Sequence, residues 1–226
     1  MQTFTSTIIS NKKFSETNFL IKLTRPKGFT FEAGQFVMLH SKNEPRPFSI
    51  ASAPSEKTLN FLIKKHEGGT VSPFLYNLKK GNKVKVIGPY GAFTVKDPLS
   101  KELIFISAGT GIAPHVSMVI DSIQRFPNKK IVLIFGYRKN FYFENILKNL
   151  EKKHKNFKLY ACCSAPGKIC KGLCGRVTVY LKRIIKSSAN KEVYLTGPPP
   201  MMQAAKKILT TDLKFKKNKI HTEKWI

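Results

Sequence analysis

The chain lacks any long apolar segment. Its longest apolar runs, at residues 103–106 and 131–135, are the length of a strand. A membrane-spanning helix needs about 20 apolar residues. The polar residues near the amino terminus do not resemble a secretory signal, in which an apolar stretch follows a charged one. We therefore expect a cytoplasmic protein with no transmembrane segment.

Cysteine is also scarce, and several catalytic motifs are missing. The four cysteines contain no Cys-x-x-Cys pair, a spacing poorly suited to zinc or iron–sulfur ligation. We therefore expect no metal site, and reduced thiols in a cytoplasmic setting. The sequence lacks Gly-x-Ser-x-Gly, His-Glu-x-x-His and Gly-x-x-x-x-Gly-Lys, which removes support for hydrolase and nucleoside-triphosphatase functions.

Acidic residues are few: 13 Asp and Glu stand against 40 Lys and Arg, which gives a formal net charge of +27. A field of this sign raises the encounter rate with an acidic redox protein, a dinucleotide, nucleic acid or an anionic membrane. The alternative is a lysine-rich solvated surface that reflects the composition of the organism's proteins. The charge alone does not decide between these interpretations.

Two patterns of secondary structure follow one another along the chain. Up to about residue 95, short β-rich runs at 19–23, 35–39, 59–63 and 83–87 alternate with turn signals, which predicts an antiparallel barrel or sandwich. From residue 103 onward, strands alternate with helices, which predicts a parallel sheet with right-handed crossovers. We expect an amino-terminal antiparallel β-barrel domain at 1–98 and a carboxyl-terminal α/β domain at 99–226.

The first of three informative motifs is Arg46-Pro47-Phe48-Ser49. A flavin nucleotide has an anionic phosphate end and a flat ring, so its site needs a cation, a stacking surface and hydrogen-bonding groups. This motif offers all three, and on a strand Arg46 and Phe48 share one face. Residues 68–72, Gly-Gly-Thr-Val-Ser, precede a helical stretch. Glycines there let the backbone approach a phosphate.

The other two motifs follow apolar strands. Gly109-Thr110-Gly111 leads into a helix with Pro114 in its first turn. Gly197-Pro198-Pro199-Pro200-Met201 follows the strand at 192–196. Loops at the carboxyl ends of parallel strands bind ligands in open α/β sheets, and such a loop presents donors to a pyrophosphate.

Together these motifs, and the turn Gly88-Pro89-Tyr90-Gly91 near the end of the barrel, resemble the ferredoxin-NADP reductase superfamily over nearly the whole chain. The resemblance implies FAD, or alternatively FMN, with Arg46 at the phosphates, Phe48 stacking near the ring and Ser49 hydrogen-bonded to it. The implied flavin-binding residues are Arg46, Pro47, Phe48, Ser49, Leu62, Ile63, Lys64, Gly68, Gly69, Thr70, Val71, Ser72 and Trp225.

The resemblance also implies a nicotinamide site, at which NADH or NADPH is the substrate. Family members usually carry Cys where this chain has Thr196, which puts a thiol role in doubt. Arg138 is available for a 2′-phosphate, but the Ser-Arg pair of NADPH-using relatives is Ser164-Ala165 here, which favours NADH. The implied dinucleotide-binding residues are Gly109, Thr110, Gly111, Pro114, Arg138, Gly197, Pro198, Pro199 and Met201.

The ending Glu223-Lys224-Trp225-Ile226 resembles that of oxygenase-linked reductases, in which an aromatic residue covers the flavin. The alternative is a tryptophan that only fills the seam between the domains. With Glu223 in proton handling, the expected catalytic residues are Ser49, Thr196, Glu223 and Trp225.

The implied reaction is hydride transfer from NAD(P)H to flavin, followed by electron delivery to an acidic redox protein such as ferredoxin, flavodoxin, a cytochrome or an oxygenase component. A free-flavin reductase is an alternative within this class. From a different class, a basic module that binds nucleic acid or an anionic membrane without redox activity is the other alternative. The flavin motif argues against a nucleic-acid partner, and weak association with anionic membranes stays open.

Overall fold

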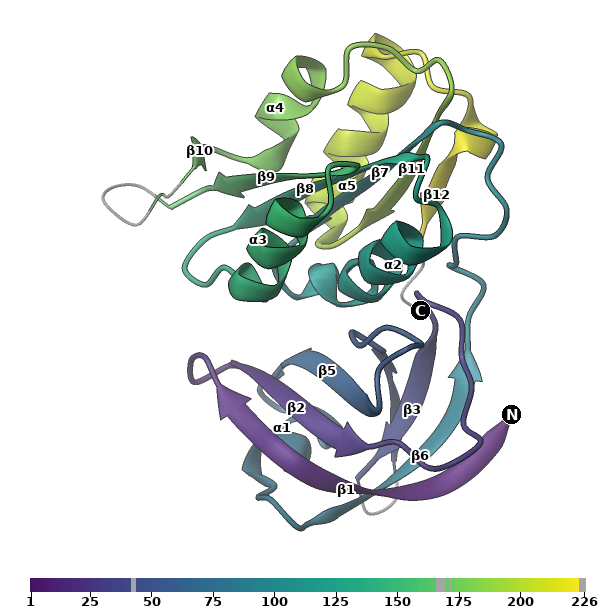
Figure 1. The fold of residues 1–226 in the computed structure, drawn as a ribbon. Helices are drawn as coiled ribbons and strands as arrows, with labels where there is room; N and C mark the ends of the chain where they lie inside the picture. The colour runs from purple at the N-terminus through teal and green to yellow at the C-terminus, as the bar shows by residue number, and fades with distance from the viewer. Residues whose placement is uncertain (42–43, 166–169, 171, 224–226) are drawn as a thin grey trace. The chain divides into compact units, whose positions relative to one another are not determined.

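The computed structural model describes residues 1–41, 44–165, 170 and 172–223 (Figure 1). The chain divides into two compact units. Unit 1 comprises Met1–Thr94 and Val116–Asp121, and unit 2 comprises Val95–His115 and Ser122–Ile226. No helix in the described residues is both long enough and apolar enough to cross a membrane.

Unit 1 contains an antiparallel, nearly closed barrel of six strands in the order β4-β3-β6-β1-β2-β5. Beyond the end of β4, the Ala51 amide donates to the Asn60 carbonyl of β5 over 2.8 Å, joining the two terminal strands. The expected barrel is therefore confirmed. Its elements are β1 (Gln2–Lys13), β2 (Asn18–Thr24), β3 (Phe36–His40), β4 (Pro45–Ser49), β5 (Thr58–Lys64), α1 (Val71–Asn77) and β6 (Lys83–Tyr90).

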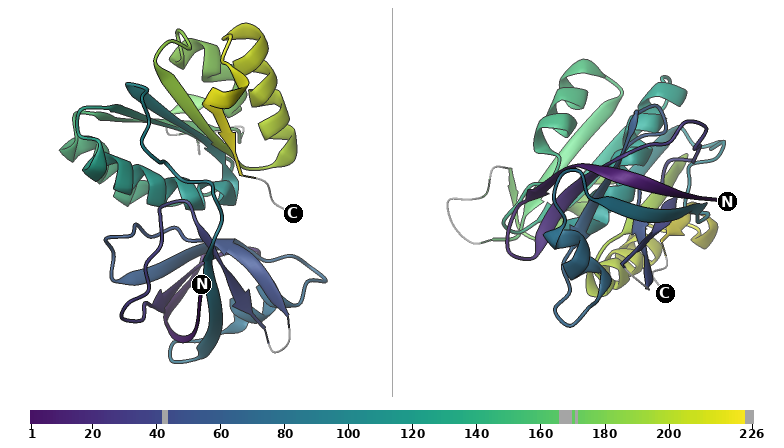
Figure 2. Two further views of the ribbon diagram at one scale, coloured as in Figure 1. Left: turned by 90° about the vertical axis from the view of Figure 1, so that its right-hand side faces the viewer. Right: turned by 90° about the horizontal axis from the view of Figure 1, so that it is seen from below.

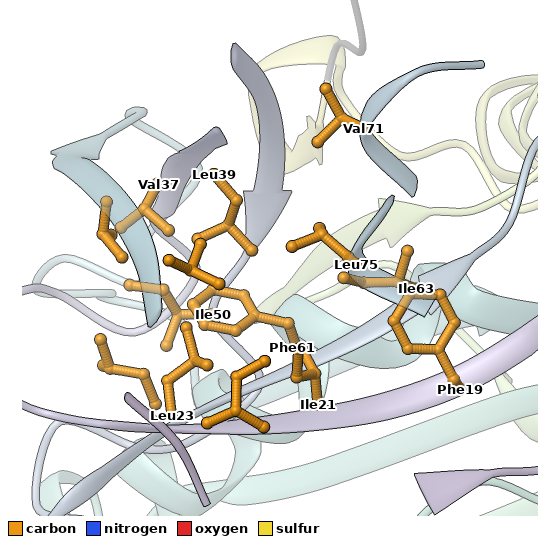
Figure 3. Packing of buried hydrophobic residues seen from close by; sticks show 14 of the residues in the cluster. Phe19, Ile21, Leu23, Val37, Leu39, Ile50, Phe61, Ile63, Val71 and Leu75 are labelled. Atoms are coloured by element: carbon orange, nitrogen blue, oxygen red, sulfur yellow. The ribbon is translucent and has the colours of Figure 1, made fainter. Parts of the chain in front are cut away.

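The barrel core follows from alternation along the strands. In β2, Phe19, Ile21 and Leu23 are fully buried while the residues between them are partly exposed. Successive side chains on a strand point to opposite faces, so one face fills the interior. Figure 3 shows these three side chains packed with others from neighbouring strands, and with Val71 and Leu75 of α1 in the same cluster.

One side chain of β1 holds the carboxyl end of α1. Asn11 Nδ2 donates to the carbonyl oxygens of Leu75, Tyr76 and Leu78 at 3.0, 3.2 and 2.9 Å. The last carbonyls of a helix have no partner within the helix itself. Asn11 therefore caps α1 and ties it to the first strand.

Unit 2 is a parallel six-stranded sheet in the order β10-β9-β8-β7-β11-β12, as the alternating pattern predicted. Helices α2 and α3 lie on one face, and α4 and α5 on the other (Figures 1 and 2). Its elements are β7 (Glu102–Ala108), η1 (Gly109–Gly111), α2 (Ile112–Arg125, of which Val116–Asp121 is grouped with unit 1), β8 (Lys130–Tyr137), α3 (Glu144–Lys153), β9 (Phe157–Cys163), β10 (Leu173–Cys174), α4 (Val177–Ile184), β11 (Lys191–Thr196), α5 (Pro199–Lys207), η2 (Ile208–Asp212), η3 (Lys217–Lys219) and β12 (Ile220–Thr222).

The strand order of unit 2 reverses at β7. The chain proceeds from β7 to β8 and β9 on one side, and returns to place β11 on the other side. Loops that leave neighbouring strands in opposite directions open a crevice at their carboxyl ends, and open α/β sheets bind ligands there. The loops after β7 and β11 lie at this point.

His115 of α2 is expected to make the folded protein sensitive to acid. Its ring is fully buried and packs edge-on against Phe105, with centroids 5.3 Å apart. Burial lowers the pKa of His115 from 6.5 to about 3. Below pH 6.5 the unfolded chain therefore binds a proton that the folded chain excludes, so the free energy of unfolding falls as the pH falls toward 3.

Urea unfolding at pH 6.5 and pH 4.5 measures this contribution. Between pH 6.5 and pH 4.5, the free energy of unfolding of the native protein is expected to fall about 2 kcal/mol further than that of the His115→Leu variant. Equal losses in the two proteins would contradict the assignment.

Candidate functional site

The two expected dinucleotide loops touch each other through their backbones. A Cβ atom built on Gly111 would lie 2.6 Å from the Gly197 Cα and 2.9 Å from its nitrogen. Real Cβ atoms do not approach this closely, so Gly111 is needed where the loops after β7 and β11 meet. The two motifs thus form one surface at the strand-order reversal of unit 2.

Gly197 is constrained as well. Its φ is +141°, and a Cβ there would lie 2.6 Å from the Met201 Cε and 3.1 Å from the Ala108 nitrogen. Proline residues then begin α5 at Pro199. Similarly, α2 begins at Ile112 after the 3₁₀ turn η1, which puts Pro114 in its first turn. A proline fits there because the first turn lacks internal acceptors for its amides.

Thr196 and Glu223, both expected to be catalytic, lie together. The Thr196 hydroxyl donates to Glu223 Oε2 over 3.3 Å, and the two residues are 0% and 8% exposed. The Glu223 amide donates to the Leu195 carbonyl over 3.4 Å. This main-chain contact continues the pairing of β12 with β11 and fixes the carboxylate at the end of β11.

Arg138 directly follows β8 and is exposed, at the same carboxyl edge as the loop after β7. Its carbonyl accepts a long hydrogen bond from the Cys163 thiol over 3.9 Å. The four cysteines are free thiols. In the described residues, no group of three or more His, Cys, Asp or Glu is arranged to hold a metal ion.

In unit 1, the two expected flavin segments converge on one carboxylate. The Arg46 guanidinium lies 3.4 Å from Glu44 Oε2, and the Thr70 hydroxyl donates to the same oxygen. Arg46 thus comes from β4 and Thr70 from the turn before α1, yet both contact one negatively charged group. A cation and a hydroxyl that share an anion have the chemistry that a flavin phosphate needs, so these residues fit the cofactor.

The turn before α1 has a defined geometry. Gly68 adopts a φ of +74°, which other residues rarely adopt, and the Gly69 amide donates to the His66 carbonyl over 3.1 Å. The buried Ser72 hydroxyl accepts from the His66 amide over 3.0 Å. Val71 is fully buried in the barrel core. These contacts hold the turn in place beside Thr70.

The remaining flavin candidates lie on the terminal strands of the barrel sheet. Phe48 is partly buried, packs against the barrel core and pairs with buried Val37, whereas Arg46 on the same face of β4 is exposed. Pro47 and the buried Ser49 alternate with them along β4. Leu62, Ile63 and Lys64 lie on β5, paired with β2.

Trp225, expected to be catalytic and to cover the flavin, lies outside the described residues. Glu44 was missed by sequence reasoning, although an acid two residues before Arg46 was a usable signal. Also missed was a polar cluster around Glu192. Its carboxylate accepts from Lys219 Nζ over 2.7 Å and from the Ser100 hydroxyl over 3.1 Å. Nothing in the local sequence brings these three residues together.

Comparison with known protein families assigns both halves of the chain. Residues 6–95 match the oxidoreductase FAD-binding domain, and residues 105–207 match the oxidoreductase NAD-binding domain. The first match covers the barrel with Arg46 and Thr70. The second begins in β7 and ends with α5, and so includes the touching glycine loops.

Several curated relatives are reductase components. The chain is 36% identical over 197 residues to the reductase component of propane 2-monooxygenase from Mycolicibacterium goodii, an alignment that covers 82% of this chain and 56% of that protein. It is 30% identical over 235 residues to the phenol hydroxylase P5 protein of Acinetobacter pittii, covering 100% of this chain and 66% of that one. The chain thus spans between about half and two thirds of the length of these relatives.

Solved structures share the fold. A cytochrome P450 reductase from Amycolatopsis superposes with a TM-score of 0.89 at 24% identity, covering 99% of this chain and 69% of that one. A ferredoxin NADP⁺ reductase from Neisseria gonorrhoeae with bound FAD and NADP superposes with a TM-score of 0.82 at 21% identity. The alignment covers 99% of this chain and 98% of that one. With its FAD-binding barrel and NAD-binding sheet, the chain belongs to the ferredoxin-NADP reductase superfamily.

Proposed function

We propose that the protein is a reductase that takes hydride from NADH or NADPH onto FAD and passes electrons to an acceptor protein. The observation that carries this proposal is that one chain contains a site suited to each cofactor. Arg46 and Thr70 contact one carboxylate as they would a flavin phosphate, and the backbones of Gly111 and Gly197 meet where a dinucleotide would bind. Bound FAD would supply the hydride acceptor and release electrons singly.

In the flavin site, Arg46 and Thr70 bind the phosphates, and the turn at residues 68–72 brings backbone amides to them. Ser49 supplies a hydrogen bond to the ring and Phe48 an apolar surface. Leu62, Ile63 and Lys64 contribute backbone contacts. These roles are supported by the shared contact with Glu44 and by the match of residues 6–95 to an FAD-binding domain.

In the nicotinamide site, Gly109, Thr110 and Gly111 face the pyrophosphate, with Pro114 holding the helix start. The rigid turn formed by Gly197, Pro198 and Pro199, with Met201, borders the nicotinamide. Thr196 orients it, and the Glu223 carboxylate, hydrogen-bonded to Thr196, handles a proton. The domain boundary of this proposal falls between residues 98 and 99.

The preferred dinucleotide is proposed to be NADH. Arg138 is an exposed cation at the carboxyl end of β8, where a 2′-phosphate would need a partner. It is followed by Lys139, but the Ser-Arg pair is absent at Ser164. Without that second arginine, a 2′-phosphate would gain little here, so NADPH has no advantage and NADH is the proposed substrate.

The proposed acceptor is an acidic redox protein, either a ferredoxin or an oxygenase component. The formal charge of +27 favours such a partner electrostatically. The names of the relatives point the same way, because propane 2-monooxygenase and a naphthalene dioxygenase system each use a reductase component. No nucleic-acid partner is proposed, and any attraction to anionic membranes would be secondary.

Anaerobic stopped-flow measurement on protein reconstituted with FAD tests the proposal. NADH or NADPH is expected to bleach the visible flavin absorbance in a saturable way, whereas protein that keeps its flavin oxidised with both dinucleotides would overturn it.

The same reduced protein, offered ferredoxin-type acceptors, is expected to lose rate several-fold between about 0.1 M and 1 M salt. The reason is that the screening length falls from about 10 Å to 3 Å. A rate that is insensitive to salt, with free flavin as the best acceptor, would instead identify a free-flavin reductase.

A further inference from the structure

A cavity of about 320 Å³ lies in unit 2, next to the amino ends of β7 and β11. It is lined by Ser100 before β7, by Lys191 at the start of β11, and by the segment that follows η2. The Gly109–Gly111 loop is at the opposite end of β7, and a seven-residue strand is about 20 Å long. The cavity is therefore separate from the dinucleotide loops.

Four lysines line the cavity: Lys191, Lys214, Lys216 and Lys219. Two of them are paired with carboxylates. Lys191 Nζ lies 2.7 Å from Glu102 Oε2, and Lys219 Nζ lies 2.7 Å from Glu192 Oε1. Glu102 is shared, because its other oxygen lies 3.3 Å from Lys130 Nζ. These pairs fix the positions of two ammonium groups at the cavity wall.

The Glu192 carboxylate is held firmly. It is 7% exposed, accepts from Ser100 and Lys219, and lies 3.3 Å from the His221 Nε2. Burial alone would raise the pKa of Glu192, but the hydrogen bonds from Lys219 and Ser100 lower it. The carboxylate thus stays charged and keeps Lys219 in place.

The other two lysines add uncompensated charge. Lys214 and Lys216 are exposed and flank the buried Phe215, and among the described residues neither forms an ion pair. Lys214 has a φ of +57°, and its carbonyl accepts from the Ser188 hydroxyl over 3.4 Å. The cavity therefore has two positive charges in excess of the two carboxylates that pair with its lysines.

From these contacts we propose that the cavity is a second anion site, one that binds a small molecule bearing a diphosphate group. Lysine ammonium groups bind phosphate as point charges. The volume lies at the lower end of the range for small-molecule pockets, which favours a compact ligand over a protein surface. An anion with two or more negative charges would balance the two excess lysine charges of the cavity.

Isothermal titration calorimetry with inorganic pyrophosphate tests this proposal. The full chain, loaded with FAD, is titrated at low salt in the absence and in the presence of saturating NAD⁺. One site is expected to remain when NAD⁺ is present. In the double variant Lys214→Gln/Lys216→Gln its affinity is expected to fall about 10-fold or more, because each charged hydrogen bond contributes about 1.5 kcal/mol or more.

The matched control is Lys152→Gln/Lys153→Gln, which removes the same charge from exposed positions at the end of α3, away from the cavity lining. The affinity of this control variant for pyrophosphate is expected to change less than about 2-fold. Absence of a saturable site, loss of the site on adding NAD⁺, or equal weakening in both variants would overturn the proposal. The proposal does not depend on the redox reaction, because the readout is heat of binding.

Discussion

Replacing Gly111 by valine is expected to weaken dinucleotide binding by roughly 10- to 100-fold while the flavin stays bound. The φ of Gly111 is −63°, so a side chain causes no backbone strain there. The defect is steric, since a Cβ would lie 2.6 Å from Gly197. Relieving that overlap must push apart the loops after β7 and β11, and overpacking of this kind costs about 1–3 kcal/mol.

Stopped-flow reduction of the FAD-loaded variant gives the apparent dissociation constant for NADH, and the visible absorbance gives the flavin content. Gly136→Ala in β8 is the matched control, because the nearest atoms to its new Cβ would lie at 3.4 Å, an ordinary contact distance. If Gly111→Val binds NADH as tightly as the control does, the touching loops are not the dinucleotide site.

Arg46→Ala is expected to weaken flavin binding, whereas Glu44→Gln is expected not to weaken it. The Arg46 guanidinium and the Thr70 hydroxyl share the Glu44 carboxylate, which would compete with a phosphate for both groups. Loss of the cation removes a charged hydrogen bond of about 1.5–3 kcal/mol, so FAD is expected to bind about 10- to 100-fold more weakly. Neutralising Glu44 removes the competing charge, so FAD is expected to bind at least as tightly as before.

Fluorescence titration of flavin-free protein with FAD measures both effects. Lys57→Ala removes an exposed cation elsewhere in unit 1 and is expected to change the affinity little. Weaker binding in Glu44→Gln than in the native protein would contradict a phosphate position at this carboxylate. It would instead mean that Glu44 is needed to position Arg46.

Strands with strong apolar patterns were predictable, and others were not. The buried run in β7 and the alternating residues of β2 gave strands within one or two residues of the observed ends. The twelve-residue β1 was not specified, because its inward positions include Ser6 as well as Ile8, and its Thr and Ser residues hide the alternation. The two- and three-residue strands β10 and β12 are too short to carry a pattern.

The site motifs were predictable as separate pieces, but their contacts were not. A glycine in a turn indicates a close approach without naming what approaches, so the contact of Gly111 with Gly197 needed the strand order of the whole sheet. The hydrogen bond from Thr196 to Glu223 depends on the pairing of β12 beside β11, which the local sequence does not encode. Residues whose partners lie far along the chain are those that local reasoning misses.

The cap that Asn11 places on α1 makes the flavin turn dependent on the start of the chain. Asn11 and Leu75 are 64 positions apart, yet three hydrogen bonds join this side chain to the helix that the turn at residues 68–72 precedes. During synthesis, β1 has already left the ribosome when the turn at residues 68–72 is made, so the strand that holds α1 is present before the turn is. A fragment that begins after β1 would contain every flavin-contacting residue proposed for unit 1. It would still lack Asn11, whose hydrogen bonds hold α1 and the turn before it.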